Sequence, residues 1–501
     1  MMGRMESMLP PLVLALLEPQ RYSGRVQRVD LVETHISWVL LAGEFAYKIK
    51  KPVKLPFLDF STLARRQACC ADEVRLNRRF SPDIYLGVVA IIDSPLGPQW
   101  GGEGAPIEYA VKMRRFDEAG RLDHVCQRGE LRATHLSDLA RTLVAFHEAA
   151  APAPAASRAG EPTQVMAPVM DNFTELLRLP DASLSIRLTA LRAWTELQFS
   201  QLGPMMASRK RAGRVRECHG DLHLANLVLI GQKVRLFDCI EFNEDLRWTD
   251  VASELAFTYI DLLAHGQPGL AGCFLDEVLS RSGDYEAALV LRFFAVYRAL
   301  VRAKVAAIRA SQACQGRSEV ETYVALAERL VSVPRRRLVI THGLSGCGKT
   351  LASSQLLLRD THAATLRLRS DVERKRLFGL GITDRSGSPL DAGLYAPDVH
   401  GRTYARLHEL AVMVLRAGWS VIVDAAFLKR AERDSFREVA KATGADFAIL
   451  APQATPDQLR ERIRARAVKG QDASEATLEV LARQRLSIEP LAVDEMQDRL
   501  P

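Results

Sequence analysis

The sequence predicts two domains of different fold class, an α+β domain with two lobes followed by a three-layer α/β domain with a parallel sheet. The first observation behind this prediction is length, because 501 residues are too many for one ordinary hydrophobic core. The second is a change of pattern, since strands precede helices up to about residue 335 but alternate with helices from residue 338 onward. The third is the proline and arginine segment at residues 334–337, which marks the boundary. We therefore expect domains at residues 1–335 and 336–501.

The composition is that of a soluble globular protein with a mild basic excess. Hydrophobic residues make up 48% of the chain and charged residues 25%, and the formal net charge is +7. A charge of this size suits phosphorylated ligands but does not require nucleic acid. The eight cysteines form no C-x-x-C pair, so we expect neither a zinc site nor a disulfide framework, and we predict a cytoplasmic location. No apolar run has the length of a membrane span, and residues 8–17 are expected to form a first helix.

The first lobe, about residues 1–115, is predicted to be a sheet with one helix. Five apolar or alternating runs are expected to form its strands: residues 26–32, 36–41, 44–50, 85–92 and 107–113. A helix is expected over residues 61–80, with Ser61 at its N-cap.

The second lobe, about residues 116–335, is predicted to be mainly helical. Its helices are expected at residues 136–150, 171–180 and 185–211 and, after a dense polar segment, within residues 250–333. Residues 150–168 are rich in Ala, Pro and Gly and show little periodicity, so we interpret them as a flexible insertion.

The second domain is predicted to alternate strands with helices. Its strands are expected at residues 338–341, 364–368, 420–423 and 447–450, and a helical tail follows from Pro456. This alternation is typical of a parallel sheet with right-handed crossovers.

A glycine-rich loop follows the first strand of this second domain. The loop Gly343-Leu344-Ser345-Gly346-Cys347-Gly348-Lys349-Thr350 fits G-x-x-x-x-G-K-[ST] and lies between a predicted strand and a predicted helix. Its glycines allow backbone N–H groups to approach phosphates, and the helix presents its positive N-terminal end to them. Lys349 is expected to reach the β- and γ-phosphates, and the Thr350 hydroxyl is expected to ligate Mg²⁺. The motif therefore predicts that Gly343, Ser345, Gly346, Cys347 and Gly348 cradle a nucleoside triphosphate such as ATP.

Polar residues after the next strands predict a metal ligand and an acceptor site. Asp424 ends an apolar strand, where a carboxylate can help to hold Mg²⁺; capping of the following segment is the alternative. Asp371 and Arg374 follow the second strand, at the edge where open α/β sheets bind ligands. We expect Asp371 to accept the proton of an acceptor hydroxyl and Arg374 to steady a phosphate. Helix capping by Ser370 or Asp371 is the alternative.

A basic segment near the end of the sequence predicts a lid. Arg462 and Arg466 lie four residues apart, so they share a helix face, and Gly470 follows them. A capping-box pattern at residues 472–475 predicts the start of another helix. We expect the two arginines to close over the γ-phosphate, and a solvated basic helix is the alternative.

This second domain resembles the small P-loop kinases over residues 338–495. That group contains polynucleotide 5′-hydroxyl kinase, gluconate kinase, chloramphenicol phosphotransferase and zeta toxin. The glycine loop carries the resemblance, together with the pair Asp371 and Arg374. It implies ATP-dependent phosphoryl transfer to a hydroxyl group of a small molecule, a sugar or a nucleotide.

The first domain carries a second set of residues suited to phosphoryl transfer. His219, Asp221 and Asn226 fit H-x-D-x-x-x-x-N, and Asp238 follows twelve residues after Asn226. Over residues 25–330 the chain resembles the protein-kinase-like fold, in its aminoglycoside phosphotransferase and choline kinase branch. The resemblance implies that Asp221 accepts a hydroxyl proton, that Asn226 and Asp238 hold Mg²⁺, and that His219 supports the loop.

The same resemblance implies a phosphate-binding lysine in the first lobe. Lys48 is the expected lysine, and Lys50, on the same face of the strand, is the alternative. Glu73 is the expected partner of the lysine, and residues 109–114 are expected to grip adenine. Two features depart from the family pattern, because a turn at residues 34–37 replaces the G-x-G-x-x-G loop and the D-F-G motif has the sequence Asp-Cys-Ile.

Three functional hypotheses follow. The chain resembles bacterial fusions of an aminoglycoside phosphotransferase-like enzyme with a P-loop kinase, so the first hypothesis is a bifunctional kinase that acts on hydroxyl-bearing small molecules. In the second, the first domain is a catalytically idle, nucleotide-sensing module that regulates the P-loop kinase. The third is a nucleic-acid end-processing kinase, although no aromatic-lined basic groove is evident in the sequence. No membrane partner is expected, and the sequence sets no oligomeric state.

Overall fold

The computed structural model describes residues 9–55, 58–313, 317–386, 397–469 and 473–500. They belong to two compact units that draw on separate stretches of the chain. The first unit comprises Met1–Leu131, Ala149–Pro154 and Val215–Thr249. The second unit comprises Arg132–Glu148, Ala155–Arg214 and Asp250–Pro501.

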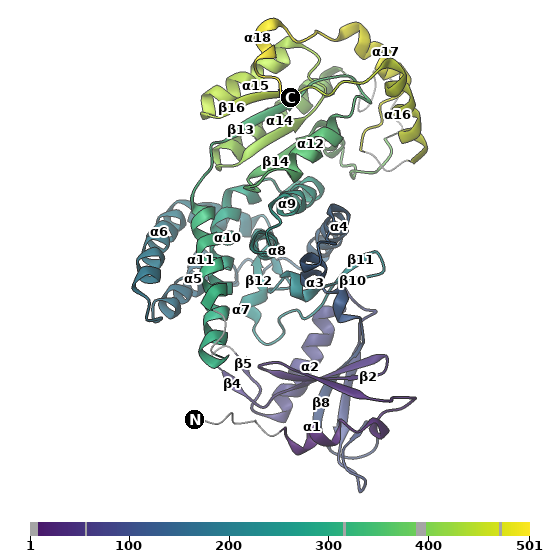
Figure 1. Cartoon of the computed structure of the whole chain (residues 1–501), viewed down its shortest axis with the longest axis vertical. Helices are drawn as coiled ribbons and strands as arrows, with labels where there is room; N and C mark the ends of the chain where they lie inside the picture. Colours follow the sequence, from purple (N-terminus) through teal and green to yellow (C-terminus); the bar gives the residue numbers. More distant parts are fainter. Residues whose placement is uncertain (1–8, 56–57, 314–316, 387–396, 470–472, 501) are drawn as a thin grey trace. The chain divides into compact units, whose positions relative to one another are not determined.

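A six-stranded antiparallel sheet forms the core of the first unit (Figure 1). Its strands in spatial order are β1 (Val29–Glu33), β2 (Ser37–Ala42), β3 (Phe45–Lys50), β8 (Pro106–Arg114), β6 (Tyr85–Ile92) and β7 (Gln99–Trp100). All five strands predicted for the first lobe are therefore present, and the short β7 is an addition to them.

The two faces of β3 serve different purposes. Successive residues of a strand point to opposite faces, so Tyr47 and Ile49 face the apolar cluster that includes Val13 of the helix α1 (Pro11–Ala15). Lys48 and Lys50 point the other way, toward the helix α2 (Leu63–Asn77). The alternation thus places two lysines of one strand on the side that carries Glu73.

Two local expectations for the first unit are wrong. The N-cap of α2 is Thr62, whose hydroxyl accepts a hydrogen bond from the Arg65 N–H at 3.3 Å, whereas the Ser61 hydroxyl donates to Asp59. Residues 109–114 lie inside β8, which pairs with β3 on one side and β6 on the other. Because the sheet uses the backbone hydrogen-bonding groups of this segment, the segment cannot grip adenine as expected.

Short elements complete the first unit around the predicted polar segment. They are η1 (Pro19–Arg21), β4 (Lys54–Leu55), β5 (Leu58–Asp59), η2 (Glu118–Gly120), α3 (Leu122–Gln127), β9 (Val215–Glu217), η3 (Leu224–Asn226), β10 (Leu227–Ile230), β11 (Lys233–Leu236), α7 (Glu244–Arg247) and β12 (Trp248–Asp250). The antiparallel hairpin of β10 and β11 starts directly after Asn226 and ends beside it, since the Phe237 N–H donates to the Asn226 carbonyl at 3.1 Å. The hairpin therefore brings the segments around Asp221 and Asp238 together.

The first part of the second unit is helical. Its helices are α4 (Ala133–Ala149), α5 (Pro162–Leu176), α6 (Ala182–Arg211), α8 (Val251–Ala264), α9 (Pro268–Ser282), α10 (Ala287–Ala313) and α11 (Arg317–Val331). The expected flexible insertion is shorter than predicted because α5 begins at Pro162. Proline is favourable at the first position of a helix, and Val169, Phe173 and Leu176 bury one face of α5, which explains the early start.

A four-stranded parallel sheet forms the rest of the second unit, as the sequence predicted. Its spatial order is β14 (Thr365–Arg369), β15 (Ser420–Asp424), β13 (Arg337–Thr341) and β16 (Asp446–Leu450). Because the strands are parallel, the segments that follow β13, β14 and β15 emerge at one edge of the sheet, where α/β proteins bind ligands.

Further helices complete this part of the second unit (Figure 1). They are α12 (Lys349–Leu358), α13 (Ser370–Arg376), α14 (Pro397–Arg416), α15 (Arg430–Thr443), α16 (Pro456–Lys469), α17 (Leu478–Ser487) and α18 (Val493–Met496). The helix expected at the capping-box pattern instead begins at Leu478, where the Thr477 hydroxyl provides the cap, and Asp472 lies outside the described residues. Within the described parts of the chain, no helix is both long and apolar enough to cross a membrane.

Candidate active sites

The glycine-rich loop after β13 has a backbone that requires glycine. The φ angles of Gly346 and Gly348 are 85° and 102°, in the left-handed region that side chains disfavour. A Cβ atom on Gly346 would also lie 2.9 Å from the Leu459 carbonyl oxygen. The ammonium group of Lys349, the first residue of α12, donates to the carbonyl oxygens of Gly343 and Leu344, both at 2.8 Å. The loop is thus a preformed cradle of backbone groups with one lysine folded over it.

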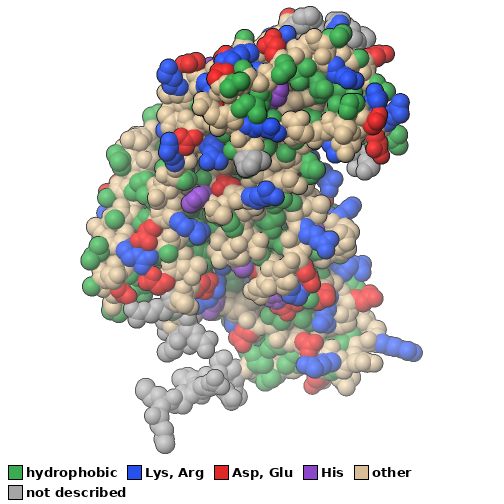
Figure 2. All heavy atoms as spheres, turned by 45° about the horizontal axis from the view of Figure 1, so that its top comes forward, with side chains coloured by type: hydrophobic (Ala, Val, Ile, Leu, Met, Phe, Trp, Pro, Cys, Tyr) green, Lys and Arg blue, Asp and Glu red, His purple; other side chains and the backbone are tan. Residues whose placement is uncertain are grey.

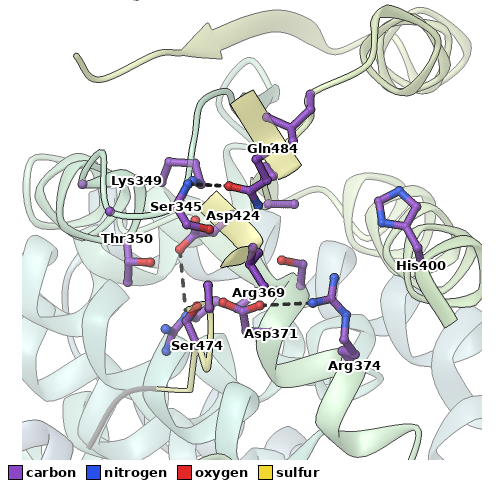
Figure 3. Close-up of a pocket in the computed structure, with 18 of the residues that line it drawn as sticks. Ser345, Lys349, Thr350, Arg369, Asp371, Arg374, His400, Asp424, Ser474 and Gln484 are labelled. Atoms are coloured by element: carbon purple, nitrogen blue, oxygen red, sulfur yellow. Dashed lines mark hydrogen bonds and ion pairs between the residues drawn. The ribbon is translucent and has the colours of Figure 1, made fainter. Parts of the chain in front are cut away.

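A cavity of about 580 Å³ opens beside this loop (Figure 3). Most of the residues predicted for the second domain line it: Ser345, Gly346, Gly348, Lys349, Thr350, Asp371, Arg374, Asp424, Arg462 and Arg466. Gly343 and Cys347 are not among its lining residues, and the Cys347 side chain is buried against Leu459 and Ile463. The cavity therefore collects polar side chains from the glycine loop, from β15 and from the helices α12, α13 and α16.

Asp371 and Arg374 lie at the wall of this cavity, on α13 (Figure 3). Their charged groups are 3.5 Å apart. Burial alone would raise the pKa of Asp371, but Arg374 and Arg369, with a hydrogen bond from Ser474, lower it below its usual value. Neither Ser370 nor Asp371 is the N-cap of α13, since that residue is Arg369, so the capping alternative does not apply. Asp371 is therefore an ionised carboxylate facing the cavity.

Thr350 and Asp424 offer oxygen atoms to the same cavity. The Thr350 side chain is exposed, and the carboxylate of Asp424, at the end of β15, is 6% exposed. One carboxylate oxygen of Asp424 accepts from the Ser353 hydroxyl at 3.4 Å and lies 3.9 Å from the Arg369 guanidinium. The N-cap of the next helix, α15, is Lys429, so Asp424 does not have the alternative capping role.

Arg462 and Arg466 both reach the cavity from α16. Arg462 donates to the Gly346 carbonyl at 3.2 Å and to the Cys347 carbonyl at 3.4 Å, and Arg466 donates to the Ala476 carbonyl at 3.1 Å. The expected lid helix thus lies against the glycine loop, and its two guanidinium groups are at the cavity.

Several lining residues were not predicted from the sequence. Arg369 is the last residue of β14, so its position at the strand end could have identified it. His400 and Tyr404 lie on α14, with ring centroids 4.5 Å apart, and the His400 ring contacts Glu432 at 2.7 Å. Gln484 accepts from the Ser345 N–H at 2.8 Å. No motif in the sequence marks these last residues, because only the packing of α14 and α17 brings them to the loop.

A second polar cluster lies in the first unit, between β3 and α2. The Lys48 ammonium group is 2.9 Å from a Glu73 carboxylate oxygen and also contacts the Asp238 carboxylate. Burial would lower the pKa of Lys48, but Asp238 and Glu73 outweigh it and raise it, so the ammonium stays charged. Lys50 contacts Glu73 and Glu241 and is fully buried, whereas the side chain of Lys48 is 11% exposed. The structure thus unites the predicted Lys48, Glu73 and Asp238, and it adds Glu241.

The segment from His219 to Asn226 is joined to the segment around Asp238 by backbone hydrogen bonds, since the Ile240 N–H donates to the His219 carbonyl at 3.1 Å. The Asn226 amide donates to the backbone carbonyl of Asp221 at 2.9 Å and to its carboxylate at 3.3 Å. The His219 ring contacts the Phe237 carbonyl at 2.8 Å, so it connects the two polar segments, as expected.

Asp238 itself has a strained backbone. Its φ angle is 62°, and its N–H donates to the Tyr85 hydroxyl at 2.9 Å. Burial raises the pKa of Asp238, but Lys48 outweighs this effect and lowers it. The conformation turns an ionised carboxylate toward Lys48.

Comparison with known proteins assigns the chain to a family. The uncharacterized protein Rv2004c of Mycobacterium tuberculosis (strain ATCC 25618 / H37Rv) is 30% identical over 457 residues, which are 91% of this chain and 89% of that protein. The uncharacterized protein Mb2027c of Mycobacterium bovis matches with the same identity and coverage. The chain belongs to the Rv2004c family.

Further matches concern the parts of this Rv2004c-family chain. A family model described as an AAA domain (AAA_33) matches residues 338–491. The amicoumacin kinase hAmiN is similar at 11% identity and a TM-score of 0.41, over 64% of this chain and 92% of that one. APH(2″)-IIia is similar at 13% identity and a TM-score of 0.38, over 64% and 98%. The APS kinase CysC of Mycobacterium tuberculosis is similar at 25% identity and a TM-score of 0.21, over 27% and 76%.

The match to the AAA-domain model agrees with the P-loop domain expected from the sequence. The glycine loop and the strands β14, β15 and β16 lie within the residues that this family model matches. This member of the Rv2004c family therefore contains a unit built on an antiparallel sheet and a P-loop domain built on a parallel sheet.

Proposed function

We propose that the P-loop domain is an ATP- and Mg²⁺-dependent kinase that phosphorylates a hydroxyl group of a small molecule, sugar or nucleotide. The observation that carries this proposal is the cavity of about 580 Å³, because the phosphate loop and the ionised Asp371 both line it. A carboxylate within reach of both a phosphate donor and an acceptor is what in-line transfer to a hydroxyl requires.

The residues of the cavity divide the reaction between them. Lys349 and the loop amides bind the β- and γ-phosphates, and Arg462 and Arg466 neutralise charge on the transferred group. The acceptor oxygen forms a bond to the γ-phosphorus, the bond from that phosphorus to the β–γ bridging oxygen breaks, and the hydroxyl proton goes to Asp371. Arg374 holds the Asp371 carboxylate in place and can bind an oxygen of the substrate.

The donor set of this site fits a magnesium ion. The Thr350 hydroxyl and the Asp424 carboxylate are oxygen ligands of the kind Mg²⁺ prefers, and both line the cavity beside the loop. When bound there, the ion would neutralise charge on the phosphates.

We further propose a second phosphotransferase site in the first unit. There Lys48, paired with Glu73, binds phosphate, Asp221 accepts the proton of a second hydroxyl acceptor, and Asn226 with Asp238 fits Mg²⁺. The specific observation that favours it is the contact of Lys48 with both Glu73 and Asp238, which joins the phosphate-binding and metal-binding groups in one cluster. The alternative is that this unit binds nucleotide without catalysis and regulates the P-loop kinase.

A nucleic-acid acceptor receives less support. On the face that Figure 2 presents, the Lys and Arg side chains of the described residues are interspersed with acidic and apolar groups and form no continuous basic band. A single-strand binding surface combines a basic groove with exposed aromatic rings. We therefore favour a small-molecule acceptor for the P-loop domain.

The test is phosphate transfer from γ-labelled ATP to a metabolite pool and to short oligonucleotides. Wild type is compared with Lys349→Ala, Asp371→Asn and Asp221→Ala. We expect Lys349→Ala and Asp371→Asn to abolish one labelled product and Asp221→Ala to abolish another. If Asp221→Ala leaves every product intact, the first unit is a binding module. If Lys349→Ala leaves every product intact, the P-loop proposal is wrong.

A further inference from the structure

A buried ion pair connects the helical part of the second unit to the parallel sheet. Arg367 in β14 and Asp276 in α9 form a bidentate pair, with Nε–Oδ1 and Nη2–Oδ2 distances of 3.3 and 2.7 Å. Both residues are nearly inaccessible, at 5% and 3% exposure. Asp276 precedes the glycine loop by more than sixty residues in sequence, outside the segment that the AAA-domain model matches.

The same arginine also contacts α12, the helix that follows the glycine-rich loop. The remaining nitrogen of Arg367, Nη1, donates to the hydroxyl groups of Ser353 and Ser354 at 3.0 and 2.8 Å, and to the Thr350 carbonyl at 3.3 Å. The single proton of the Ser353 hydroxyl has two acceptors within reach, the Thr350 carbonyl at 3.0 Å and the Asp424 carboxylate at 3.4 Å. A continuous set of hydrogen bonds therefore runs from α9 to the two proposed metal ligands, Thr350 and Asp424.

The position of α9 is fixed at both of its ends. A Cβ atom on Gly269, in its first turn, would lie 2.0 Å from the carbonyl oxygen of Leu358 in α12, so only glycine fits this approach. At the other end, the Arg376 guanidinium donates to the Ser280 carbonyl at 2.5 Å. Figure 1 shows α9 beside α12 and β14, in agreement with these contacts. The helix is thus packed as tightly as an element of the P-loop domain itself.

The charges of Arg367 and Asp276 connect this ion pair to the proposed metal site. A buried guanidinium needs a compensating carboxylate, and removing one partner of such a pair leaves an uncompensated charge. Asp424 is linked to Arg367 through the Ser353 hydroxyl, and its carboxylate contributes to the raised pKa of the Arg367 guanidinium. Without Asp276, Arg367 would therefore attract the Asp424 carboxylate, which the metal requires.

We propose that Asp276 is a positioning residue of the P-loop active site: by neutralising Arg367 it keeps Thr350 and Asp424 available to the metal. This inference rests on the proposed function of the P-loop domain. According to this inference, α9, which precedes residue 335, helps to form that active site.

The test is an Mg²⁺ titration of full-length protein. The variant Asp276→Asn keeps the shape of the side chain and removes its charge. Its matched control is Glu277→Gln, on the next residue of α9, where a partly exposed carboxylate pairs with Arg281. The readouts are the Mg²⁺ dependence of fluorescent-ATP binding, restricted to the component that Lys349→Ala removes, and the Mg²⁺ dependence of the Lys349-dependent product.

We expect Asp276→Asn to raise the Mg²⁺ concentration needed for half-maximal binding by about 10- to 100-fold, as loss of an outer partner of a metal ligand typically does. Glu277→Gln should change it far less, because Glu277 acts on the charge of Arg367 more weakly than Asp276 does. The double variant Asp276→Asn/Arg367→Gln removes both charges, so Asp424 is released and the Mg²⁺ dependence should return to within about threefold of wild type.

Each outcome decides the question. If Asp276→Asn behaves like Glu277→Gln, or if the double variant is as impaired as Asp276→Asn, the inference is wrong. If Asp276→Asn does not fold, the double variant alone decides, because the inference requires it to fold and to bind Mg²⁺ normally. If the wild type itself lacks Lys349-dependent transfer, the proposed function fails, which is a different result.

Discussion

At the residue scale, the charge of Asp371 depends on its arginine neighbours. Its folded-state pKa lies below the ordinary value of an aspartate, about 4, so in the wild type Asp371 stays ionised until the pH falls below that value. The variant Arg374→Gln removes a positive charge beside Asp371. The effect of burial would then be less opposed, and the pKa of Asp371 would rise. We predict that this variant loses P-loop kinase activity at a higher pH than the wild type does.

The measurement for this prediction is the pH dependence of kcat/KM for the Lys349-dependent product. The control is Arg402→Gln, which removes an exposed arginine of α14 and should leave the acid limb in place. An unchanged acid limb in Arg374→Gln, with a uniform loss of rate, would show that Arg374 acts on the substrate and not on Asp371.

Two lysines of β3 are predicted to differ in role although they share one face. Lys48→Met should abolish the transfer that depends on Asp221 and leave the melting temperature nearly unchanged, because Glu73 keeps its contact with Lys50 and the Asp238 side chain is 44% exposed. Lys50→Met should destabilise the first unit by about 3–5 kcal/mol, because it leaves Glu73 and Glu241 buried without Lys50. Product assays and thermal unfolding of both variants check this, and an unstable Lys48→Met beside a stable Lys50→Met would contradict it.

At the element scale, the contact between the glycine loop and α16 is predicted to control nucleotide binding. In Gly346→Ala the new methyl group would meet the Leu459 carbonyl oxygen at 2.9 Å, so α16 and its Arg462 must move away from the loop. We expect fluorescent-ATP affinity at the Lys349-dependent site to fall at least tenfold, since strain of about 1 kcal/mol from the positive φ adds to the clash.

The control for this prediction is Gly379→Ala. Gly379 also has a positive φ, of 69°, but a Cβ atom there would meet nothing within 4 Å. Gly379→Ala therefore introduces the conformational strain of a positive φ but displaces no helix. Equal affinity loss in both variants would contradict the role given to α16.

Elements whose signal lies in neighbouring residues could be predicted from the sequence, and elements fixed by distant contacts could not. The four strands of the parallel sheet and the loop after β13 were predicted because apolar runs and glycine spacing are local. The role of Arg367 could not be predicted, because it depends on Asp276, which is distant in the sequence and contacts Arg367 only in the folded chain. The N-cap of α2 was misplaced by one residue for a similar reason, since Ser61 and Thr62 are equally suitable and the bond to Asp59 decides between them.

The candidate sites show the same division. Lys349 and Asp371 follow strands and Asp424 ends one, so strand order alone brings them to one edge. His400 and Gln484 lie on helices whose packing no local pattern describes, and they were missed.

At the scale of the whole molecule, the two proposed sites share no residue. Lys48, Glu73, Asp221, Asn226 and Asp238 all belong to the first unit, whereas the residues of the P-loop cavity belong to the second. A fused chain of this kind is predicted to bind two nucleotides, and each should remain when the other site is disabled.

Calorimetric titration with a non-hydrolysable ATP analogue and Mg²⁺ measures this prediction. We expect two equivalents bound per wild-type chain, one in Lys349→Ala, one in Lys48→Met and none in the double variant. If the sites are independent, the affinity of the remaining site should change by less than about threefold, because a larger change is a coupling free energy between the two units.

A stoichiometry of one in the wild type would remove the second site from the proposal. A stoichiometry of two with strong coupling would instead favour a first unit that senses nucleotide and regulates the P-loop kinase, since reciprocal effects on affinity are what such regulation requires.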